Sequence, residues 1–297
     1  MKAGEQGFLL LTGYLGAPER KPLTIAQFRD LTKRVQAMER PTYDREMTQE
    51  DLISIGCSRA FAGRVLTLLN QKEQLQWYVS KGKRSACIPI TRITSGYPEM
   101  VRKRLGLDAP GVLWAKGDVT LLQTKKISVV GSRELKEENR AFAEEIGKQA
   151  ALQGYTLVSG NARGADRTAQ NSCLEYGGGV ICVVADRLEK YPFRENVLYL
   201  SEDGFDLDFS SQRALQRNRV IHSLGGMTFV AQCRLEKGGT WDGTANNLRH
   251  CWSSVFCFRD ESPASMELEQ MGAVLIDSEA LQDISALQPN SMNFIDQ

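Results

Sequence analysis

Two strand-to-helix turns carry the residues best placed to do chemistry. Gly131-Ser132-Arg133 follows an apolar run at 126–130, and the segment 159–167 follows a second apolar run at 155–158. Each turn combines glycine, a hydroxyl group and arginine just before a helix-forming segment. Backbone N–H groups at a helix start and guanidinium groups both attract anions. The two turns therefore predict a phosphate-binding site at one edge of a sheet.

The second turn is the more specific of the two. Local structure alone would explain Gly164 as a tight-turn residue and Asp166 as a helix N-cap. It does not explain Arg163 and Arg167, because a helix start disfavours cations unless an anion is present. We therefore expect an anion at this turn. The candidate residues that it contributes are Ser159, Gly160, Asn161, Arg163, Gly164 and Arg167.

Two later segments repeat this chemistry. Arg213 and Arg217 are four apart, so they would share one face of a helix. A glycine and hydroxyl turn at 237–240 follows the apolar run 227–231, and a helix is expected from 243 to 250. Four such turns on one side of a parallel sheet would make a groove for several phosphates. The other three turns contribute the candidates Gly131, Ser132, Arg133, Arg217, Asn218, Arg219, Lys237, Gly238, Gly239 and Thr240.

The elements that must position these turns alternate between strand and helix. Short apolar runs separated by helical patterns predict an α/β fold, an extended Rossmann-like parallel sheet with helices on both faces. The expected strands are 86–90, 111–117, 126–130, 155–158, 180–184, 227–231, 254–258 and 273–276.

The first part of the chain has a different pattern. Helical periodicity and helix-start signals at Thr24, Thr48 and Ser58 predict a small helical N-terminal domain over 1–85, like a SAM or helix-hairpin-helix unit. We expect the Rossmann-like domain over 86–280 and a C-terminal tail over 281–297.

The composition excludes several classes of protein. The chain has 297 residues, 42% of them hydrophobic, and its apolar runs stay far below the ~18 residues that a membrane helix needs. We expect a cytoplasmic protein that does not contact a membrane. Seven scattered cysteines and two histidines give little material for disulfides, a metal site or a catalytic triad, so no metal, no cofactor and no enzymatic activity are predicted.

The charge is unevenly distributed along the chain. Residues 1–106 hold 18 Lys and Arg against 10 Asp and Glu, whereas the remainder holds 19 against 26. Part of the excess lies in a basic connector at 81–104. This asymmetry indicates one surface for a polyanion and another for a different partner.

The motifs in combination resemble the DNA-processing protein A family (DprA/Smf), over about residues 50 to 260. Where that family usually has isoleucine before the aspartate of the second turn and a histidine in the next helix, this chain has Ala165 and Gln170. Arg259-Asp260 replaces a usual proline-glycine, and the winged-helix tail of many members is not found. The chain is thus identified as a divergent member. The segments that carry the resemblance are 88–98, 112–117, 129–133, 158–166, 177–178, 217–221 and 238–245.

The resemblance implies a function. It implies a Rossmann-like domain that binds single-stranded DNA as a homodimer, protects incoming DNA and helps to load a RecA-type recombinase in transformation or recombination. It places along the phosphate groove Ser132, Arg133, Ser159, Gly160, Arg163, Lys237, Gly239 and Thr240.

Two other functions would use the same pocket. A nucleotide-sensing module would bind a small nucleotide there and signal to a partner, although it would not need the basic connector. A nucleoside monophosphate phosphoribohydrolase would need a glutamate after its glycine-rich turn, where this chain has Thr244-Ala245-Asn246-Asn247.

Overall fold

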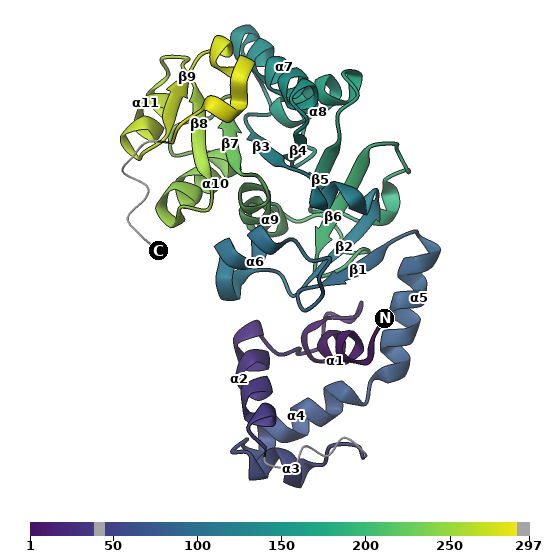
Figure 1. Ribbon diagram of the computed structural model, residues 1–297. Helices are drawn as coiled ribbons and strands as arrows, with labels where there is room; N and C mark the ends of the chain where they lie inside the picture. The colour runs from purple at the N-terminus through teal and green to yellow at the C-terminus, as the bar shows by residue number, and fades with distance from the viewer. Residues whose placement is uncertain (39–44, 290–297) are drawn as a thin grey trace.

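A computed structural model describes residues 1–38 and 45–289, and within them the chain builds one nine-stranded sheet. The strand order across the sheet is β1-β2-β6-β5-β4-β3-β7-β8-β9 (Figure 1). In chain order the strands are β1 (Ile88–Thr91), β2 (Val112–Gly117), β3 (Lys126–Val130), β4 (Thr156–Ser159), β5 (Val180–Val183), β6 (Val197–Glu202), β7 (Met227–Val230), β8 (Ser254–Phe258) and β9 (Val274–Ile276).

The sheet confirms the expected α/β class but is mixed rather than parallel throughout. From β6 to β9 all neighbouring strands are parallel, whereas β2 runs antiparallel to both β1 and β6. The chain passes from β2 to β3 through the short η2 turn (Val119–Gln123) without a helical crossover. Strand β3 therefore starts at the end of the sheet where β2 finishes and runs opposite to it, so the parallel expectation fails at the edge formed by β1 and β2. The sequence analysis also missed β6, which is buried along its whole length.

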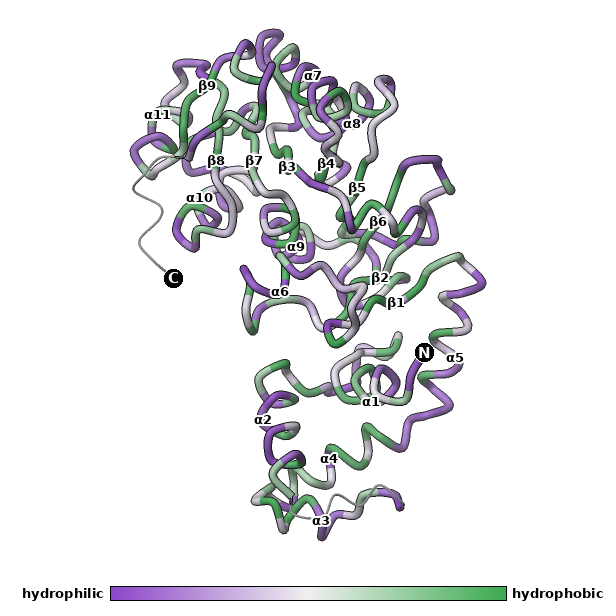
Figure 2. Tube along the Cα trace, viewed as in Figure 1, coloured by the Kyte–Doolittle hydropathy of each residue, from purple (hydrophilic) through white to green (hydrophobic). Residues whose placement is uncertain are grey.

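Helices cover both faces of the sheet, as predicted. Side chains of β3 alternate between the two faces, so that Ile127 and Val129 join one hydrophobic core and Val130 joins the other. The first core contains residues of α7 (Glu137–Leu152) and α8 (Ala165–Glu175). The second contains residues of α6 (Glu99–Leu105), α9 (Ser211–Leu224), α10 (Gly238–His250) and α11 (Pro263–Gln270). Figure 2 shows the central strands as largely hydrophobic between these layers.

The described part of the first 84 residues contains helices joined by loops, and no strand. Their helices begin at the predicted signals: the hydroxyl groups of Thr24, Thr48 and Ser58 each accept a bond from a backbone N–H in the first turn. The helices are α1 (Ala3–Thr12), α2 (Ile25–Gln36), α3 (Gln49–Ser54), α4 (Arg59–Leu69) and α5 (Lys72–Arg84). None of the helices in the described ranges is both long enough and apolar enough to cross a membrane.

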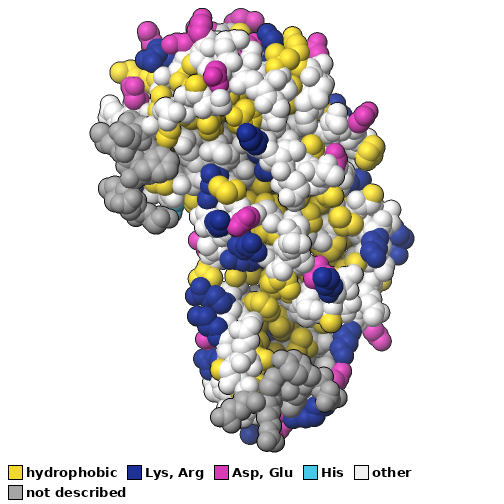
Figure 3. Space-filling model, in the orientation of Figure 1, with side chains coloured by type: hydrophobic (Ala, Val, Ile, Leu, Met, Phe, Trp, Pro, Cys, Tyr) yellow, Lys and Arg dark blue, Asp and Glu magenta, His cyan; other side chains and the backbone are white. Residues whose placement is uncertain are grey.

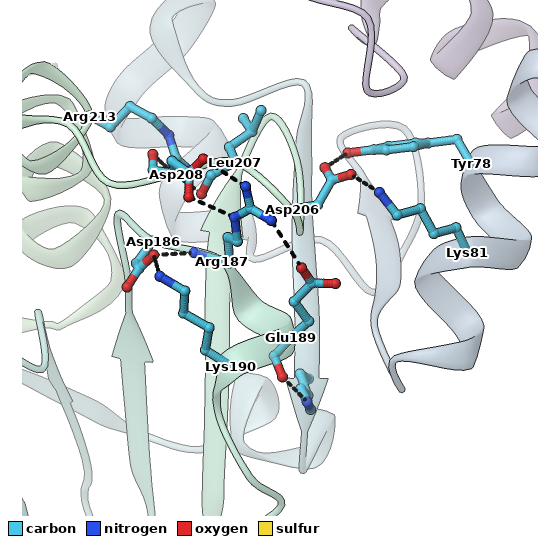
Figure 4. Close-up of polar contacts among 11 residues, drawn as sticks. Tyr78, Lys81, Asp186, Arg187, Glu189, Lys190, Asp206, Leu207, Asp208 and Arg213 are labelled. Atoms are coloured by element: carbon cyan, nitrogen blue, oxygen red, sulfur yellow. Dashed lines mark hydrogen bonds and ion pairs between the residues drawn. The ribbon is translucent and has the colours of Figure 1, made fainter.

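Helix α5 joins the helical part to the sheet. Its Tyr78 hydroxyl donates to Asp206 at 2.7 Å, and Lys81 forms an ion pair with the same carboxylate at 2.6 Å (Figure 4). The Tyr78 ring also packs against Trp114 and Phe205, with centroids 5.3 Å and 4.9 Å away. A buried aromatic cluster topped by an ion pair therefore fixes the loop that follows β6.

The boundaries at residues 85 and 280 stay predictions. After β9, η4 (Ser278–Ala286) buries Leu281 and Ile284 in the core beside α7, so packed chain continues past residue 280. Residues 290–297 of the predicted tail lie outside the described ranges.

Candidate nucleic-acid interface

A pocket lies where the chain changes direction across the sheet. From β3 the chain moves through β4 and β5 to β6 on one side, then returns to β7 on the other side of β3. Open α/β sheets bind ligands at the carboxyl ends of strands beside such a switch point. A cavity of about 710 Å³ occupies this position. Its lining residues are Val130, Gly131, Ser132, Arg133, Glu134, Ala162, Arg163, Asp166, Phe209, Ser211, Ala214, Leu215, Arg217, Asn218, Ile221, Arg234, Lys237, Gly238, Gly239 and Thr240.

The turn after β3 forms the back of the pocket. The Ser132 N–H donates to the Gln232 carbonyl at 2.8 Å, and the Ser132 carbonyl accepts from the Ala165 N–H at 3.1 Å. These bonds hold the turn between the end of β7 and the start of α8. Arg133 then extends from a rigid base, is exposed, and has no ion pair with any residue in the described ranges.

The turn after β4 is organised around a buried carboxylate. Asp166 accepts from the N–H groups of Gly160 at 2.9 Å and Ala162 at 3.2 Å. Burial raises the pKa of Asp166, while Arg217 and these two N–H groups oppose that rise. The expected helix N-cap is therefore wrong in detail, because Asp166 satisfies the loop before α8 rather than the helix start. The same bonds make these N–H groups unavailable to a phosphate.

Gly164 permits the close approach of the two turns. It has φ of +84°, and a Cβ there would lie 2.6 Å from the carbonyl oxygen of Arg133. Any other residue would push the β3 and β4 turns apart. Their arginines therefore reach the same cavity because this position is glycine.

Arg217 forms the floor of the pocket. It extends from α9 across the sheet edge, where its guanidinium donates to the Gly160 carbonyl at 2.6 Å and also to the Val183 carbonyl. Burial lowers the pKa of this arginine, and the nearby Asp166 carboxylate opposes the shift. The side chain thus ties α9 to the ends of β4 and β5 while keeping a positive charge in the cavity.

The start of α10 faces the pocket with its N–H groups uncapped. The helix begins at Gly238, five residues before the predicted start at 243, and the N-cap Lys237 makes no side-chain capping bond. The Thr240 hydroxyl donates to the Gly131 carbonyl at 3.0 Å, and Asn218 donates to the Gly239 carbonyl at 2.9 Å. These two bonds fix the helix start against β3 and α9. Its free first-turn N–H groups are suited to an anion.

The lining is positively charged overall. Five Lys or Arg residues line the cavity against two acidic residues, Glu134 and Asp166. Glu134 lies between two arginines at the mouth, 3.5 Å from Arg163 and 3.4 Å from Arg234. All three side chains are at least 67% exposed. Exposed pairs of this kind are weak, so a phosphate could replace Glu134 as the partner of either arginine.

The structure brings together ten of the sixteen predicted site residues at this lining. The remaining six are not part of the cavity lining. Ser159 is buried and accepts from Gln170, while Arg167 is exposed outside the cavity. Arg219 pairs with Glu202 at 2.7 Å. The six residues outside the lining are Ser159, Gly160, Asn161, Gly164, Arg167 and Arg219.

Arg213 does not share the pocket with Arg217, although the two are four apart. Its guanidinium donates to the carbonyls of Ala185, Leu207 and Asp208 at 2.9 to 3.0 Å, and it lies among the loop residues drawn in Figure 4. It therefore holds the loop after β6 on the end of β5. The cluster predicted on α9 is split between the pocket and this structural role.

The sequence analysis missed Arg234 and Phe209. Arg234 follows β7, whose carboxyl end must lie beside that of β3 once β7 returns to the switch point. This position in the sequence could have identified Arg234 as a candidate site residue. Phe209 precedes α9, is 56% exposed and lines the cavity, and no local pattern distinguished it from an ordinary loop residue.

Groups for acid/base or metal chemistry are scarce around the cavity. No cluster of three or more His, Cys, Asp or Glu that could hold a metal occurs in residues 1–38 and 45–289. His222 is buried in a hydrogen-bonded group with Thr228 and Asn247, and burial lowers its pKa to about 3. It is a neutral packing residue at physiological pH.

The switch-point cavity, the uncapped helix start and the arginines give this Rossmann-like fold a site that is suited to an anion. The comparisons then specify the family. The model of the family described as DNA recombination-mediator protein A matches residues 89–284, and the chain belongs to this family.

Known relatives agree with this assignment. The DNA processing protein DprA of Bacillus subtilis (strain 168) is 31% identical over 144 residues, covering 45% of this chain and 48% of the relative. The chain spans about half the length of the first curated relatives that it matches.

Solved structures match the fold. The X-ray structure of DNA processing protein A from Streptococcus pneumoniae has a TM-score of 0.71 at 21% identity, covering 97% of this chain and 99% of that one. A second structure, of DNA processing protein A from Helicobacter pylori and its single-stranded DNA binding mode, has a TM-score of 0.55 at 21% identity. It covers 66% of this chain and 94% of that one.

Proposed function

We propose that this chain binds single-stranded DNA through the switch-point pocket and acts in DNA processing during recombination. The observation that carries the proposal is the combination of the uncapped start of α10 with Arg133, Arg163 and Arg234 around one open cavity. Successive phosphates of a strand can each meet a separate cation there, and affinity for a polyanion grows with the number of such contacts.

The pocket also offers apolar surface beside the cations. Phe209 and Leu215 line it and are 56% and 49% exposed. Unpaired bases stack on exposed aromatic rings, whereas the bases of a duplex are already stacked. This arrangement favours a single strand over a duplex.

The family suggests partners for this proposal. The relatives are DNA processing proteins, and one is described by its binding to single-stranded DNA. We extend this to a cytoplasmic homodimer that protects incoming single strands and helps to load a RecA-type recombinase. We assign the chain no enzymatic activity, because Glu134 and Asp166, the acids that line the pocket among the described residues, are engaged by arginines and by backbone N–H groups.

The test is binding of a fluorescent oligothymidine to Arg133→Ala and Arg163→Ala variants over a range of salt concentrations. Loss of one phosphate contact should lower affinity about fivefold at 0.1 M salt and make the slope of log K against log salt shallower by about 0.7. Arg249→Ala, an exposed arginine at the far end of α10, is the matched control. Unchanged affinity in both pocket variants would exclude this site.

A nucleotide-sensing role is the second candidate. A cavity of about 710 Å³ falls within the roughly 300–1,000 Å³ of typical small-molecule sites. Thermal unfolding with nucleoside mono-, di- and triphosphates separates the two functions. Stabilisation by one nucleotide at micromolar concentration, without tight oligonucleotide binding, would favour sensing.

A further inference from the structure

A second group of cations lies outside the pocket, between the helical part and the sheet. It consists of Arg29 on α2, Arg92 after β1 and Arg102 on α6, and we call it the α2–α6 strip. Arg29 and Arg102 are exposed, and Arg92 is partly buried. Figure 3 shows Lys and Arg side chains gathered along the edge formed by α6 and α2.

Arg92 lies next to Arg102 and within electrostatic range of Arg29. Arg102 donates to the backbone carbonyl of Arg92 at 3.4 Å, and Arg92 donates to the Ala109 carbonyl at 3.1 Å. The pKa of Arg92 is lowered by burial and further by the positive charges of Arg102 and Arg29, with the Tyr97 hydroxyl opposing. The strip is thus a site of mutual repulsion that a bound anion would relieve.

No carboxylate in the described ranges neutralises the strip. The nearest acids in the sequence are engaged elsewhere, since Asp30 pairs with Arg34 at 2.9 Å and Glu99 pairs with Lys103 at 3.0 Å. None of the three strip arginines has an ion pair with a residue of 1–38 or 45–289.

Two cations of the basic connector at 81–104 have structural partners. Arg104 is partly buried and donates to the Ser223 carbonyl at 3.0 Å and to the Gly225 carbonyl, at the end of α9. Lys81 pairs with Asp206. The strip arginines, by contrast, have no carboxylate partner in the described ranges.

The strip lies within reach of a strand bound in the pocket. Helix α6 is fixed to α9 through Arg104, and Arg219 of α9 donates to the Asp108 carbonyl at 3.2 Å, just after α6. The first half of α9 lines the pocket. Its 14 residues correspond to about 21 Å, and known single-strand sites extend over roughly 4–16 nucleotides.

We propose that the α2–α6 strip is a second phosphate-contact surface, which holds the sugar-phosphate backbone of a single strand after it leaves the switch-point pocket. The inference rests on the proposed function, because it requires the strand to occupy the pocket. It predicts that a short oligonucleotide uses the pocket alone and a long one uses both surfaces.

The experiment measures binding of five- and thirty-nucleotide oligothymidines to the full chain by fluorescence anisotropy. The double variant Arg29→Ala/Arg102→Ala should bind the long probe about 25-fold more weakly at 0.1 M salt, with a slope shallower by about 1.4. Its affinity for the short probe should equal that of the wild type. The charge-matched control Lys125→Ala/Arg249→Ala removes two exposed cations elsewhere and should leave both affinities unchanged.

The outcomes separate the two proposals. If Arg133→Ala weakens both probes while the strip variant binds the long probe normally, the pocket stands and the strip proposal is overturned. If neither Arg133→Ala nor Arg163→Ala weakens binding of either probe, the proposed function fails, whatever the strip variant does. The strip proposal would also be overturned if the strip variant lost affinity equally for a long duplex and a long single strand. It would be overturned as well if the variant bound DNA normally but no longer bound an acidic protein partner.

Discussion

Replacing Gly160 by alanine should damage the pocket although Gly160 is not itself among the residues that line it. A Cβ at this position would lie 2.5 Å from Cζ and 2.6 Å from Nη1 of Arg217. Ordinary contacts need at least about 3.4 Å, so the guanidinium must move by about 1 Å. The backbone of Gly160 is not in the left-handed region, so the clash with Arg217 is the main cost.

The displacement breaks two hydrogen bonds. Arg217 loses its bonds to the Gly160 and Val183 carbonyls, and a charged bond of this kind contributes about 1.5–3 kcal/mol. We expect the free energy of unfolding to fall by about 2–4 kcal/mol, since some bonding to water compensates. Oligothymidine affinity should fall about fivefold, as for loss of one phosphate contact.

A double-mutant cycle tests the cause. In an Arg217→Ala background the obstructing group is absent, so Gly160→Ala should cost less than about 1 kcal/mol in urea unfolding. Gly226→Ala is the control, because its Cβ would meet only the Lys126 carbonyl at 3.6 Å. Equal cost of Gly160→Ala in both backgrounds would refute this reasoning, and so would wild-type stability in the single variant.

Three further predictions follow from the geometry. Glu134→Gln should raise oligothymidine affinity about two- to fivefold and steepen the salt slope, because it frees the two arginines at the mouth; reduced affinity would contradict this. Phe209→Ala should weaken single-strand binding by about 1–3 kcal/mol with an unchanged salt slope, if bases stack there. Burial raises the pKa of Glu202 to about 7 despite its ion pair with Arg219, so the folded state binds more protons than the unfolded state. The free energy of unfolding should therefore fall as pH rises from 5 to 8, by up to about 3 kcal/mol; urea titrations that show the same slope in Glu202→Gln would exclude this group as the cause.

The sequence predicted the parts of the site that depend on local order. A strand, a glycine turn and a helix start recur after β3 and β4, and parallel strands bring such turns to one edge. That reasoning was sufficient to place Arg133 and Arg163 together. The same reasoning placed residues 237–240 at the pocket, although helix α10 begins earlier than expected.

The features of the site that the sequence analysis could not predict depend on contacts between residues that are distant in the sequence. Arg219 was assigned to the groove because the strand that carries its partner, β6, was not recognised, and Glu202 ends that strand. Arg213 has the right spacing to join Arg217, but its partners are carbonyls of two loops. Helical spacing predicts which residues share a face of α9, but not which parts of the protein that face contacts. It therefore could not distinguish Arg217, which lines the pocket, from Arg213 and Arg219.

Under the proposed function, Asp166 bears on which kind of anion suits the pocket. By accepting from Gly160 and Ala162, it takes the place that a phosphate would occupy if the β4 turn bound its ligand through backbone N–H groups. Anion binding then falls to the start of α10 and to side chains spread around an open mouth. Separate, exposed cations suit a chain of singly charged phosphates better than the concentrated charge of one nucleotide's terminal phosphates. The internal carboxylate thus favours a polymeric ligand at this site.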